Sequence, residues 1–462
     1  MSIYMSLTLL VMISLCLTLI EGARRSCCRL ETECAVDIGL NSIMAEYHRE
    51  LFRQYDLFYI DSSYGTPVPS YCNTQARLEY YVEQNLNSRE DESLVYKDFL
   101  GLELLDASIH EVAFATDENG KRFQKRAAQI MLDEVGIGYI EDILEWIGIV
   151  EEHKLTEFDL EEEREQVQRE IREVVGEESV GRDFWMPMDY ISMLSGQGLL
   201  INLIHSDRIS NQTVDLSTHI SMRKSSGALN SGNASDSVSV SLTERILFHE
   251  YIMNHAGYWG QEKEGSFLKY QIEYVLHGAD SDKENLINIW TKLFLIRGVA
   301  NVIHIYSDYV KMGAVKAVAA VATAVIPELE PVVEAALVLG WAYVESLYDM
   351  KVLVAGGKVP LLKSSADWHY DLDSILYSVD MEVEGENQRG LQYKDYLHIL
   401  LYLTNSQKLT YRFMDLMEMD IRTTEGNAEF RMDGCIEWLS IQASVRSRMG
   451  YVHSVQAQIA YE

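Results

Sequence analysis

The residues of this chain that come closest to a catalytic motif are His249, Glu250 and His255, in the segment HEYIMNH. A zinc protease needs two histidines four residues apart on one helix face, with the glutamate directly after the first. Met253 occupies that fourth position, and His255 lies six residues on, on a different face. The remaining histidines are scattered singly along the chain. We therefore assign none of them to a metal.

Other motifs for binding or catalysis also fail. The segment DSDKEN begins like a calcium loop, but its sixth residue is Asn285 rather than Gly and its twelfth is Thr291 rather than Glu. Ser281 followed by Glu284 predicts a helix cap there instead. AGGKV at residues 355–359 lacks the spacing of a phosphate-binding loop, and G-x-S-x-G does not occur. We predict no catalytic, cofactor-binding or metal-binding residue, and no cofactor.

Acidic residues inside apolar helical stretches supply the alternative to a non-enzymatic protein. They are Glu250, Glu273, Asp308 and Glu345. If they line one cleft, they suit a membrane-anchored surface enzyme such as a hydrolase. An acid in a helix bundle more often pairs with Arg or Tyr, or faces water. A structure that gathers three or more of them in a cleft would favour the enzyme.

Composition narrows the class of protein. Of 462 residues, 47% are apolar and 24% charged, as in ordinary folded proteins. Asp and Glu number 71 against 39 Lys and Arg, which gives a net charge of −32. So much negative charge repels phosphate backbones, so we expect no nucleic-acid partner. Six cysteines in this length do not make a disulfide scaffold.

The N-terminus carries a candidate membrane span. Residues 3–20 contain no charge and, as a helix, reach about 27 Å, close to the ~30 Å hydrocarbon core of a bilayer. No basic residue precedes the run and no A-x-A follows it, which favours a retained anchor over a cleaved signal peptide. Polar residues within the run can bond to backbone carbonyls or to a neighbouring helix. They are Ser6, Thr8, Ser14 and Thr18.

An amphipathic segment continues directly from the anchor. Its apolar residues recur every three to five positions, which indicates one helix face. They are Leu30, Cys34, Ile38, Ile43, Tyr47, Leu51, Tyr55 and Phe58. We predict an unbroken helix over residues 3–58, roughly 84 Å long, with two separate helices as the alternative. Cys27 and Cys34 are two turns apart, too far to bridge within one helix. We therefore expect reduced thiols packed as small apolar residues, with a disulfide across two chains as the alternative.

A second apolar stretch, residues 312–344, is divided by charges into pieces of about ten residues, which predicts buried core helices rather than a span. Pro327 and Pro331 predict a turn between them. The membrane is then crossed once.

The fold class that we predict is mainly α with minor β (α+β): a long N-terminal transmembrane and amphipathic helix, then a large, mostly helical body with short antiparallel strands. Strands are expected at residues 100–116, 368–372 and 430–445, and helices at 123–149, 243–277, 281–309 and 393–422. The expected segments are consecutive: an anchor (1–22), the amphipathic helix (23–64), an acidic α+β region (65–224), a flexible linker or loop (225–242), a helical core (243–350) and a C-terminal α+β region (351–462).

Several stretches carry a resemblance to a known family. SIYMSLTLLVMISLCLTLIEGARRS and AEYHRELFRQYDLFYIDSSYG, at residues 2–26 and 45–65, resemble the start of the TadE/TadG-like, pseudopilin-related membrane proteins of Gram-positive bacteria. More closely, the chain resembles an uncharacterised domain-of-unknown-function family. That likeness also includes ERILFHEYIMNH, YQIEYVLHGADSDKENL, WAYVESLYDMKVLVAGGKVPLLK and YKDYLHILLYLT.

The resemblance implies a location and an assembly rather than a chemistry. Tad-type loci build type IV-like pili and secretion apparatus, in which a long N-terminal helix holds subunits in the membrane and packs them together. It implies a single-pass protein of the cell membrane, an extracellular body, and partners among pilus or secretion subunits. Two features depart from the pattern: no basic leader precedes the apolar run, and its first acid is Glu21. Arg24, Arg25 and Arg29 favour the opposite orientation by the positive-inside rule.

Overall fold

The computed structural model describes residues 2–87, 100–132, 137–156, 165–167, 169–170, 209–223, 239–373 and 389–461. The chain divides into two compact units, and each is described by itself. Unit 1 comprises Met1–Ile130, Ser217–Arg245 and Phe413–Glu462, and unit 2 comprises Met131–Leu216 and Ile246–Arg412. Each unit therefore combines stretches far apart in the sequence. The consecutive segments expected from the sequence stay a prediction, and most of the expected linker, 225–238, lies outside the described residues.

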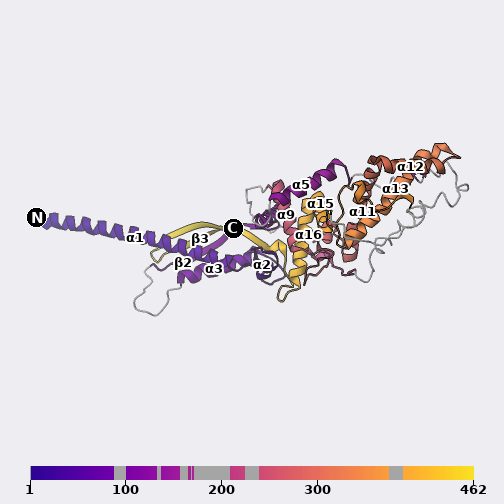
Figure 1. Ribbon diagram of the computed structural model, residues 1–462. Helices are drawn as coiled ribbons and strands as arrows, with labels where there is room; N and C mark the ends of the chain where they lie inside the picture. Colours follow the sequence, from indigo (N-terminus) through magenta and orange to yellow (C-terminus); the bar gives the residue numbers. More distant parts are fainter. Residues whose placement is uncertain are drawn as a thin grey trace. The chain divides into compact units, whose positions relative to one another are not determined.

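Unit 1 is an antiparallel sheet with two long helices packed on it (Figure 1). Its elements are α1 (Ser2–Met44), α2 (Arg49–Tyr55), β1 (Ile60–Asp61), α3 (Tyr71–Asn87), β2 (Glu103–Phe114), η1 (Asp117–Gly120), η6 (Met432–Gly434), β3 (Cys435–Arg446) and β4 (Val452–Ala460). The central strand β3 pairs with β2 on one side and with β4 and β1 on the other. The helix α1 packs against α3 and β4, and α3 packs against β2.

Unit 2 is helical in its described part. It contains α5 (Ile137–Glu152), α10 (Gln271–His277), α11 (Asp282–Ser307), α12 (Tyr309–Ala322), η4 (Pro327–Leu329), α13 (Glu330–Val354), η5 (Ser365–Asp367) and α15 (Tyr393–Leu403). Helices α4 (Lys121–Met131), α9 (Leu242–His255) and α16 (Ser406–Arg422), and the short η3 (Leu216–Thr218), each contain residues of both units. The predicted α+β class, with its long N-terminal helix, is confirmed.

The apolar stretch at 312–344 forms α12 and α13, with the predicted turn at Pro327. The expectation of two buried core helices is right for α13 and wrong for α12. Only Val315 and Ala319 of α12 are buried, whereas Val321 is 80% exposed. A different helix, α11, is long and apolar enough to cross a membrane, but two thirds of its most apolar window lies buried in unit 2. We therefore assign α11 to the core.

The predicted helix over residues 3–58 is wrong in its length, because α1 ends at Met44. The chain leaves the helix where Tyr47 forms a β-bridge with Ile60 and the His48 N–H donates to the Tyr59 carbonyl at 2.9 Å. His48 then caps α2 by accepting the Leu51 N–H at its Nδ1. The alternative of a separate anchor is wrong as well, because α1 continues from the apolar run to Met44 without a break.

Four further elements and one helix cap differ from the sequence prediction. The expected helix 243–277 is interrupted by a loop at 256–270, and the expected helix 393–422 is divided at Thr404. The expected strand 368–372 does not form, because the backbone N–H groups of His369 and Tyr370 donate to the Glu345 carboxylate instead of to a neighbouring strand. Ser281 begins α11 without the predicted side-chain cap. The strand β4 was not predicted at all.

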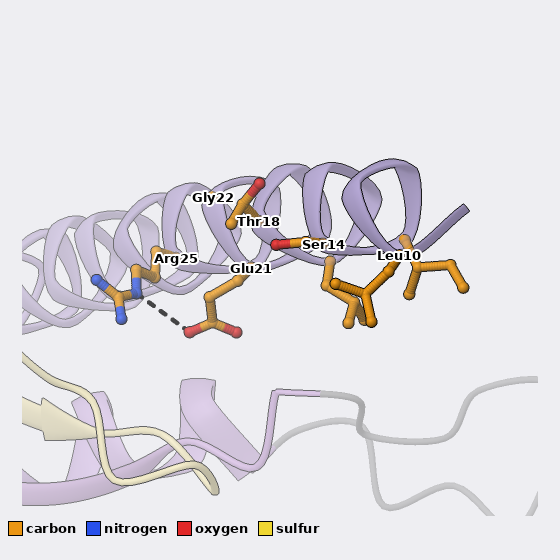
Figure 2. Close-up of a pocket in the computed structure, with 8 residues that line it drawn as sticks. Leu10, Ser14, Thr18, Glu21, Gly22 and Arg25 are labelled. Carbon is orange, nitrogen blue, oxygen red and sulfur yellow. Dashed lines mark hydrogen bonds and ion pairs between the residues drawn. The ribbon is translucent and has the colours of Figure 1, made fainter. Parts of the chain in front are cut away.

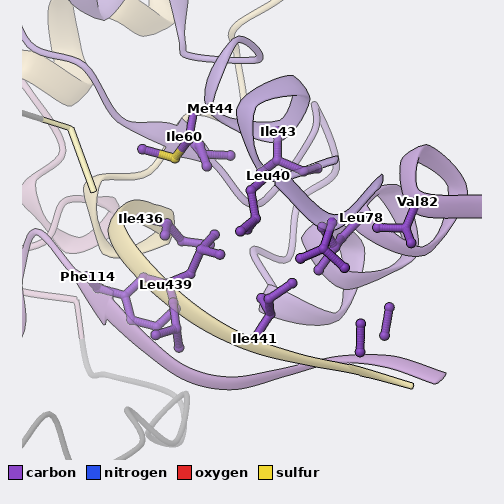
Figure 3. Close-up of a cluster of buried hydrophobic side chains, with 14 residues drawn as sticks. Leu40, Ile43, Met44, Ile60, Leu78, Val82, Phe114, Ile436, Leu439 and Ile441 are labelled. Carbon is purple, nitrogen blue, oxygen red and sulfur yellow. The ribbon is translucent and has the colours of Figure 1, made fainter. Parts of the chain in front are cut away.

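The core of unit 1 lies between the sheet and the two helices (Figure 3). The labelled side chains point toward one another from α1, α3 and three strands: Leu40, Ile43, Met44, Ile60, Leu78, Val82, Phe114, Ile436, Leu439 and Ile441. Ile43 is wholly buried here, and Leu51 of α2 is wholly buried as well. The second half of α1 is therefore an integral part of the fold of unit 1.

Ile43→Asp should unfold unit 1 far more readily than Ile38→Asp in the same helix. Ile43 is 0% exposed and Ile38 is 49% exposed, so only the first substitution buries an unpaired carboxylate. We expect a loss of about 3–5 kcal/mol for Ile43→Asp, measured as the shift in urea midpoint of the full chain in detergent. Equal midpoints for the two variants would show that the α1 packing contributes little to stability.

Candidate functional site

The first half of α1 projects from the rest of unit 1 (Figure 1), and none of its most apolar window is buried. Every large apolar side chain from Ile3 to Ile20 is between 51% and 79% exposed. Burying one such side chain is worth roughly 1.5–3 kcal/mol, so a helix of this composition is unfavourable in water. The N-terminal helix is long and apolar enough to span a membrane.

The polar side chains in this half of α1 mostly bond to their own helix. The hydroxyls of Ser6, Thr8 and Thr18 donate to carbonyl oxygens three or four residues earlier, at 2.8 to 3.0 Å. Such bonds satisfy a hydroxyl inside a bilayer. Within the described residues Ser14 has no hydrogen-bond partner, and it borders a hollow along one face of α1 together with Leu10 and Thr18 (Figure 2).

Ion pairs follow directly after the apolar run. Arg25 Nε lies 3.1 Å from Glu21 Oε1, drawn as a dashed line in Figure 2, and Arg29 Nε lies 2.8 Å from Glu33 Oε1. All four side chains are at least 39% exposed, so the pairs contribute little to stability. They place the first charges of α1 at the end of the apolar run, where a spanning helix meets water.

The second half of α1 has a buried face and an exposed face. Cys28, Thr32, Val36, Leu40 and Ile43 are buried against α3 and the sheet. The position of the helix over β4 is also fixed at its end, where the Tyr461 hydroxyl donates to the Met44 carbonyl at 2.6 Å.

The exposed face corrects the predicted apolar stripe. Leu30 is 62% exposed, Ile38 is 49% exposed, and Cys27 and Cys34 are exposed free thiols. At 100° per residue, Leu30 and Ile43 point about 140° apart around the helix. The predicted stripe, in which apolar residues recur every three to five positions, therefore combined residues of two different helix faces. Leu30, Cys34 and Ile38 form a separate apolar face, called here the outer face of α1, which the described body does not cover.

The four acids proposed to line a cleft each lie beside different side chains of unit 2. Glu250 Oε1 lies 3.0 Å from His398 Nδ1. Asp308 caps α12 by accepting the N–H groups of Val310 and Lys311, and also accepts the Ser365 hydroxyl at 2.6 Å. These donors hold the pKa of Asp308 well below its usual range.

Glu345 belongs to a buried network of four charges. Its carboxylate pairs with the Lys363 ammonium, which also lies 2.5 Å from Asp349 Oδ1. Arg297 donates from Nε to Asp349 Oδ2 at 3.0 Å. All four side chains are at most 1% exposed. Two cations therefore balance two anions, although burial still raises the pKa of Glu345.

Further hydrogen bonds complete this network, which we call the buried charge cluster (Arg297, Glu345, Asp349 and Lys363). Arg297 Nη1 donates to the carbonyls of Pro360 and Leu361 at 2.8 and 2.6 Å. The Asn301 amide donates to Asp349 Oδ2 at 3.1 Å. Because its members satisfy one another, the cluster acts as a polar connection between α11, α13 and the segment after α13.

Sequence reasoning found Glu345 but missed Arg297, Asp349 and Lys363. The sequence did contain a signal for Arg297, which stands within the apolar run LFLIRGVANV. A charged residue in such a run needs a buried partner of opposite charge. The segment that supplies Lys363 carries no comparable pattern.

The remaining motif residues have structural roles. His255 Nδ1 lies 2.9 Å from the Tyr251 carbonyl. Asp282 of the calcium-like segment accepts the Lys269 N–H at 3.0 Å and the Ser210 hydroxyl at 2.7 Å. Across the described ranges, no group of three or more His, Cys, Asp or Glu side chains is arranged to hold a metal ion.

Comparison with known proteins gives one family. A family model described as "Family of unknown function (DUF5702)" matches residues 177–447, more than half of the chain. No curated protein and no solved structure matches. The expected membership of an uncharacterised domain-of-unknown-function family is therefore confirmed. The match contains the buried charge cluster and does not extend to α1, and it carries no link to TadE/TadG-like proteins.

Proposed function

Because this chain belongs to that family of unknown function, DUF5702, which brings no activity with it, we propose from its own geometry that it is a non-enzymatic, single-span protein of the cell membrane. In this proposal an acidic body outside the cell is carried on α1. The protein serves as a structural or accessory component of a Tad-like pilus or secretion assembly, with other subunits as partners.

The observation that carries the proposal is the continuity of α1. One helix of 43 residues has a first half exposed along its whole apolar length and a second half built into the core of unit 1. Movement or rotation of the first half is therefore transmitted directly to the sheet. A flexible tether suffices to keep a protein at a membrane, whereas a continuous helix also fixes its orientation, as assembly into an ordered array requires.

The outer face of α1 supports the choice of partner. Leu30, Cys34 and Ile38 lie next to the apolar run and remain uncovered by the described body. A neighbouring subunit held in the same membrane presents its own helix at the same height. The proposed kind of assembly and the proposed extracellular position of the body rest on the resemblance of residues 2–26 and 45–65 to TadE/TadG-like proteins.

The test is crosslinking between subunits through the outer face. Mild oxidation of membranes that contain the full chain should give a dimer through Cys34, because that thiol is exposed on the face proposed to meet a neighbour. Leu30→Glu together with Ile38→Glu should reduce the dimer at least about tenfold, since 1.4 kcal/mol of lost association suffices for that factor. The measurement is the dimer fraction on a non-reducing gel.

The control for this experiment is Cys72, an exposed thiol on α3 of the same unit. A chain in which Cys72 is the one remaining exposed cysteine should give no dimer under the same oxidation. Dimers of equal yield through Cys72 and Cys34 would indicate random collision in the membrane. A Cys34 dimer that survives both glutamate substitutions would also contradict assembly through the outer face.

A further inference from the structure

The loop at residues 256–269 of unit 2 is fastened by two buried polar side chains of α10. Gln271 Oε1 accepts the Gly257 N–H at 2.9 Å, and Glu273 Oε1 accepts the Trp259 N–H at 3.0 Å. The Ile272 N–H donates back to the Gly257 carbonyl at 3.0 Å. Both Gln271 and Glu273 are 0% exposed. The start of the loop is therefore held from the protein interior.

Glu273 uses one oxygen for all of its contacts. Besides the Trp259 N–H, Oε1 accepts the hydroxyl of Tyr393 on α15 at 2.8 Å. Oε2 is buried and has no hydrogen-bond partner among the described residues. A carboxylate seeks donors at both oxygens, whereas a carboxylic acid carries its own proton on one of them. A buried hydroxyl without an acceptor costs less than a buried negative oxygen without a donor, so the arrangement favours the neutral acid, with Oε1 as the carbonyl oxygen and the proton on Oε2.

Among the described residues, no basic side chain pairs with Glu273, and the charge that acts on it is the negative charge of Asp282. The titratable groups that interact with Glu273 are Tyr258 and Tyr270 of the loop, Asp282 of α11 and Tyr393 of α15. Further out, Asp395 acts on Tyr258 and Glu262 acts on Tyr270. Of the two lysines in the loop, Lys269 acts on Asp282, and the Lys263 ammonium donates to the His255 carbonyl at 2.9 Å. The tyrosines are neutral at physiological pH, and α13 contributes the Val354 carbonyl, which accepts the Trp259 Nε1–H at 3.2 Å. Desolvation, assisted by the Asp282 charge, raises the pKa of Glu273 to about 7.

We propose that Glu273 is a proton-operated latch, which in its neutral form holds the loop at residues 256–269 onto α10 and α15 and in its ionised form releases it. Loss of the Oε2 proton to solvent leaves a buried negative charge with an undonated oxygen and a like charge at Asp282. Water must then reach the carboxylate, and in this proposal the loop that carries Trp259 opens to admit it, although the Trp259 N–H bond by itself favours the ionised form. The latch is independent of membrane anchoring.

The direction of the pH dependence follows from the sign of the shift. An unfolded glutamate has a pKa near 4.3, so the folded state binds the proton more tightly. The contribution of Glu273 is complete at acid pH and is lost as the pH rises through about 7. The loop should therefore be closed at pH 5.5 and open progressively up to pH 8.5.

The experiment is hydrogen exchange of the full chain in detergent, followed by mass spectrometry of peptides that cover residues 256–270. After correction for intrinsic exchange, wild-type protection in this peptide should fall about tenfold between pH 6 and pH 8. Glu273→Gln keeps the acceptor and cannot ionise, so its protection should be independent of pH. Glu262→Gln alters an exposed acid of the same loop and should behave as wild type.

A second variant keeps the proposal falsifiable if Glu273→Gln disturbs the fold. The Tyr393 hydroxyl stabilises the ionised form of Glu273, so Tyr393→Phe should move the opening transition to higher pH. Constant protection of the wild type from pH 6 to pH 8 would overturn the latch. An unchanged transition in Glu273→Gln, or a transition that Tyr393→Phe moves to lower pH, would overturn it as well.

Discussion

Deleting residues 2–20 is expected to convert this protein from a membrane-bound to a soluble one. The deletion removes thirteen large apolar side chains that are all more than half exposed in the structure. Their transfer from water to lipid is worth roughly 20 kcal/mol or more in sum, far beyond what any peripheral contact supplies. The buried face of α1 begins at Cys28, so unit 1 should keep its core. The measurement is the carbonate-resistant membrane fraction after expression of both chains.

A control separates anchoring from loss of length. Leu10→Asp with Ile13→Asp keeps the helix but places charges mid-span, and it should weaken membrane retention in the same direction. The intact mass of the membrane-bound chain shows whether residues 1–22 remain, and labelling of Cys72 in intact cells by a membrane-impermeant maleimide reports an external body. A truncated chain that stays in the carbonate-resistant fraction would contradict a single N-terminal anchor.

Local sequence predicted the first half of α1 and not the second. An uncharged run of this length has few alternatives, and its exposure in unit 1 agrees with that reading. Which face of the second half is buried depends on α3, β2 and a hairpin at the other end of the chain. Tyr461, for example, bonds to the Met44 carbonyl across almost the whole sequence. A single sequence does not encode such pairings as a local pattern.

Buried polar groups explain the other failures. A strand at residues 368–372 was predicted from the alternation of Trp368, Tyr370 and Leu372. In the structure the Glu345 carboxylate accepts two backbone N–H groups of this segment that would otherwise donate to a neighbouring strand. The Tyr47 bridge to Ile60 likewise ends a helix whose apolar periodicity continues to Phe58. In each case a hydrogen bond to a distant residue is stronger than the local preference. Of the four candidate acids, Glu250, Glu273 and Glu345 are buried and Asp308 is partly exposed, and the sequence did not identify the particular partner of any of them.

The buried charge cluster should be the most sensitive point of unit 2. Lys363→Met removes one of two cations and leaves Glu345 and Asp349 to share Arg297. Breaking a buried pair in this way costs about 3–5 kcal/mol, because an uncompensated charge remains in the interior. Lys316→Met on α12 is the matched control, since that lysine is exposed, and it should cost less than about 0.5 kcal/mol. Urea unfolding followed by tryptophan fluorescence measures both.

Restoring the charge balance should recover part of that loss. In Lys363→Met with Glu345→Gln, Arg297 and Asp349 remain as a neutral pair, and the amide oxygen accepts one of the two N–H groups of His369 and Tyr370, which bond to separate oxygens of the Glu345 carboxylate. The double variant should therefore be more stable than Lys363→Met alone, with a coupling of about 1–3 kcal/mol in a double-mutant cycle. Purely additive costs would show that Lys363 and Glu345 do not act on one another.

The pH dependence of Lys363→Met then distinguishes lost charge from lost packing. Burial already raises the pKa of Glu345, and removal of the Lys363 ammonium, which lowers it, raises it further. A raised pKa means that the folded state holds the proton more tightly. The loss of stability in the variant should therefore be smallest at acid pH and should grow as the pH rises. If the loss of unfolding free energy were the same at every pH, its cause would be the missing side-chain volume beside Trp368 rather than the missing charge.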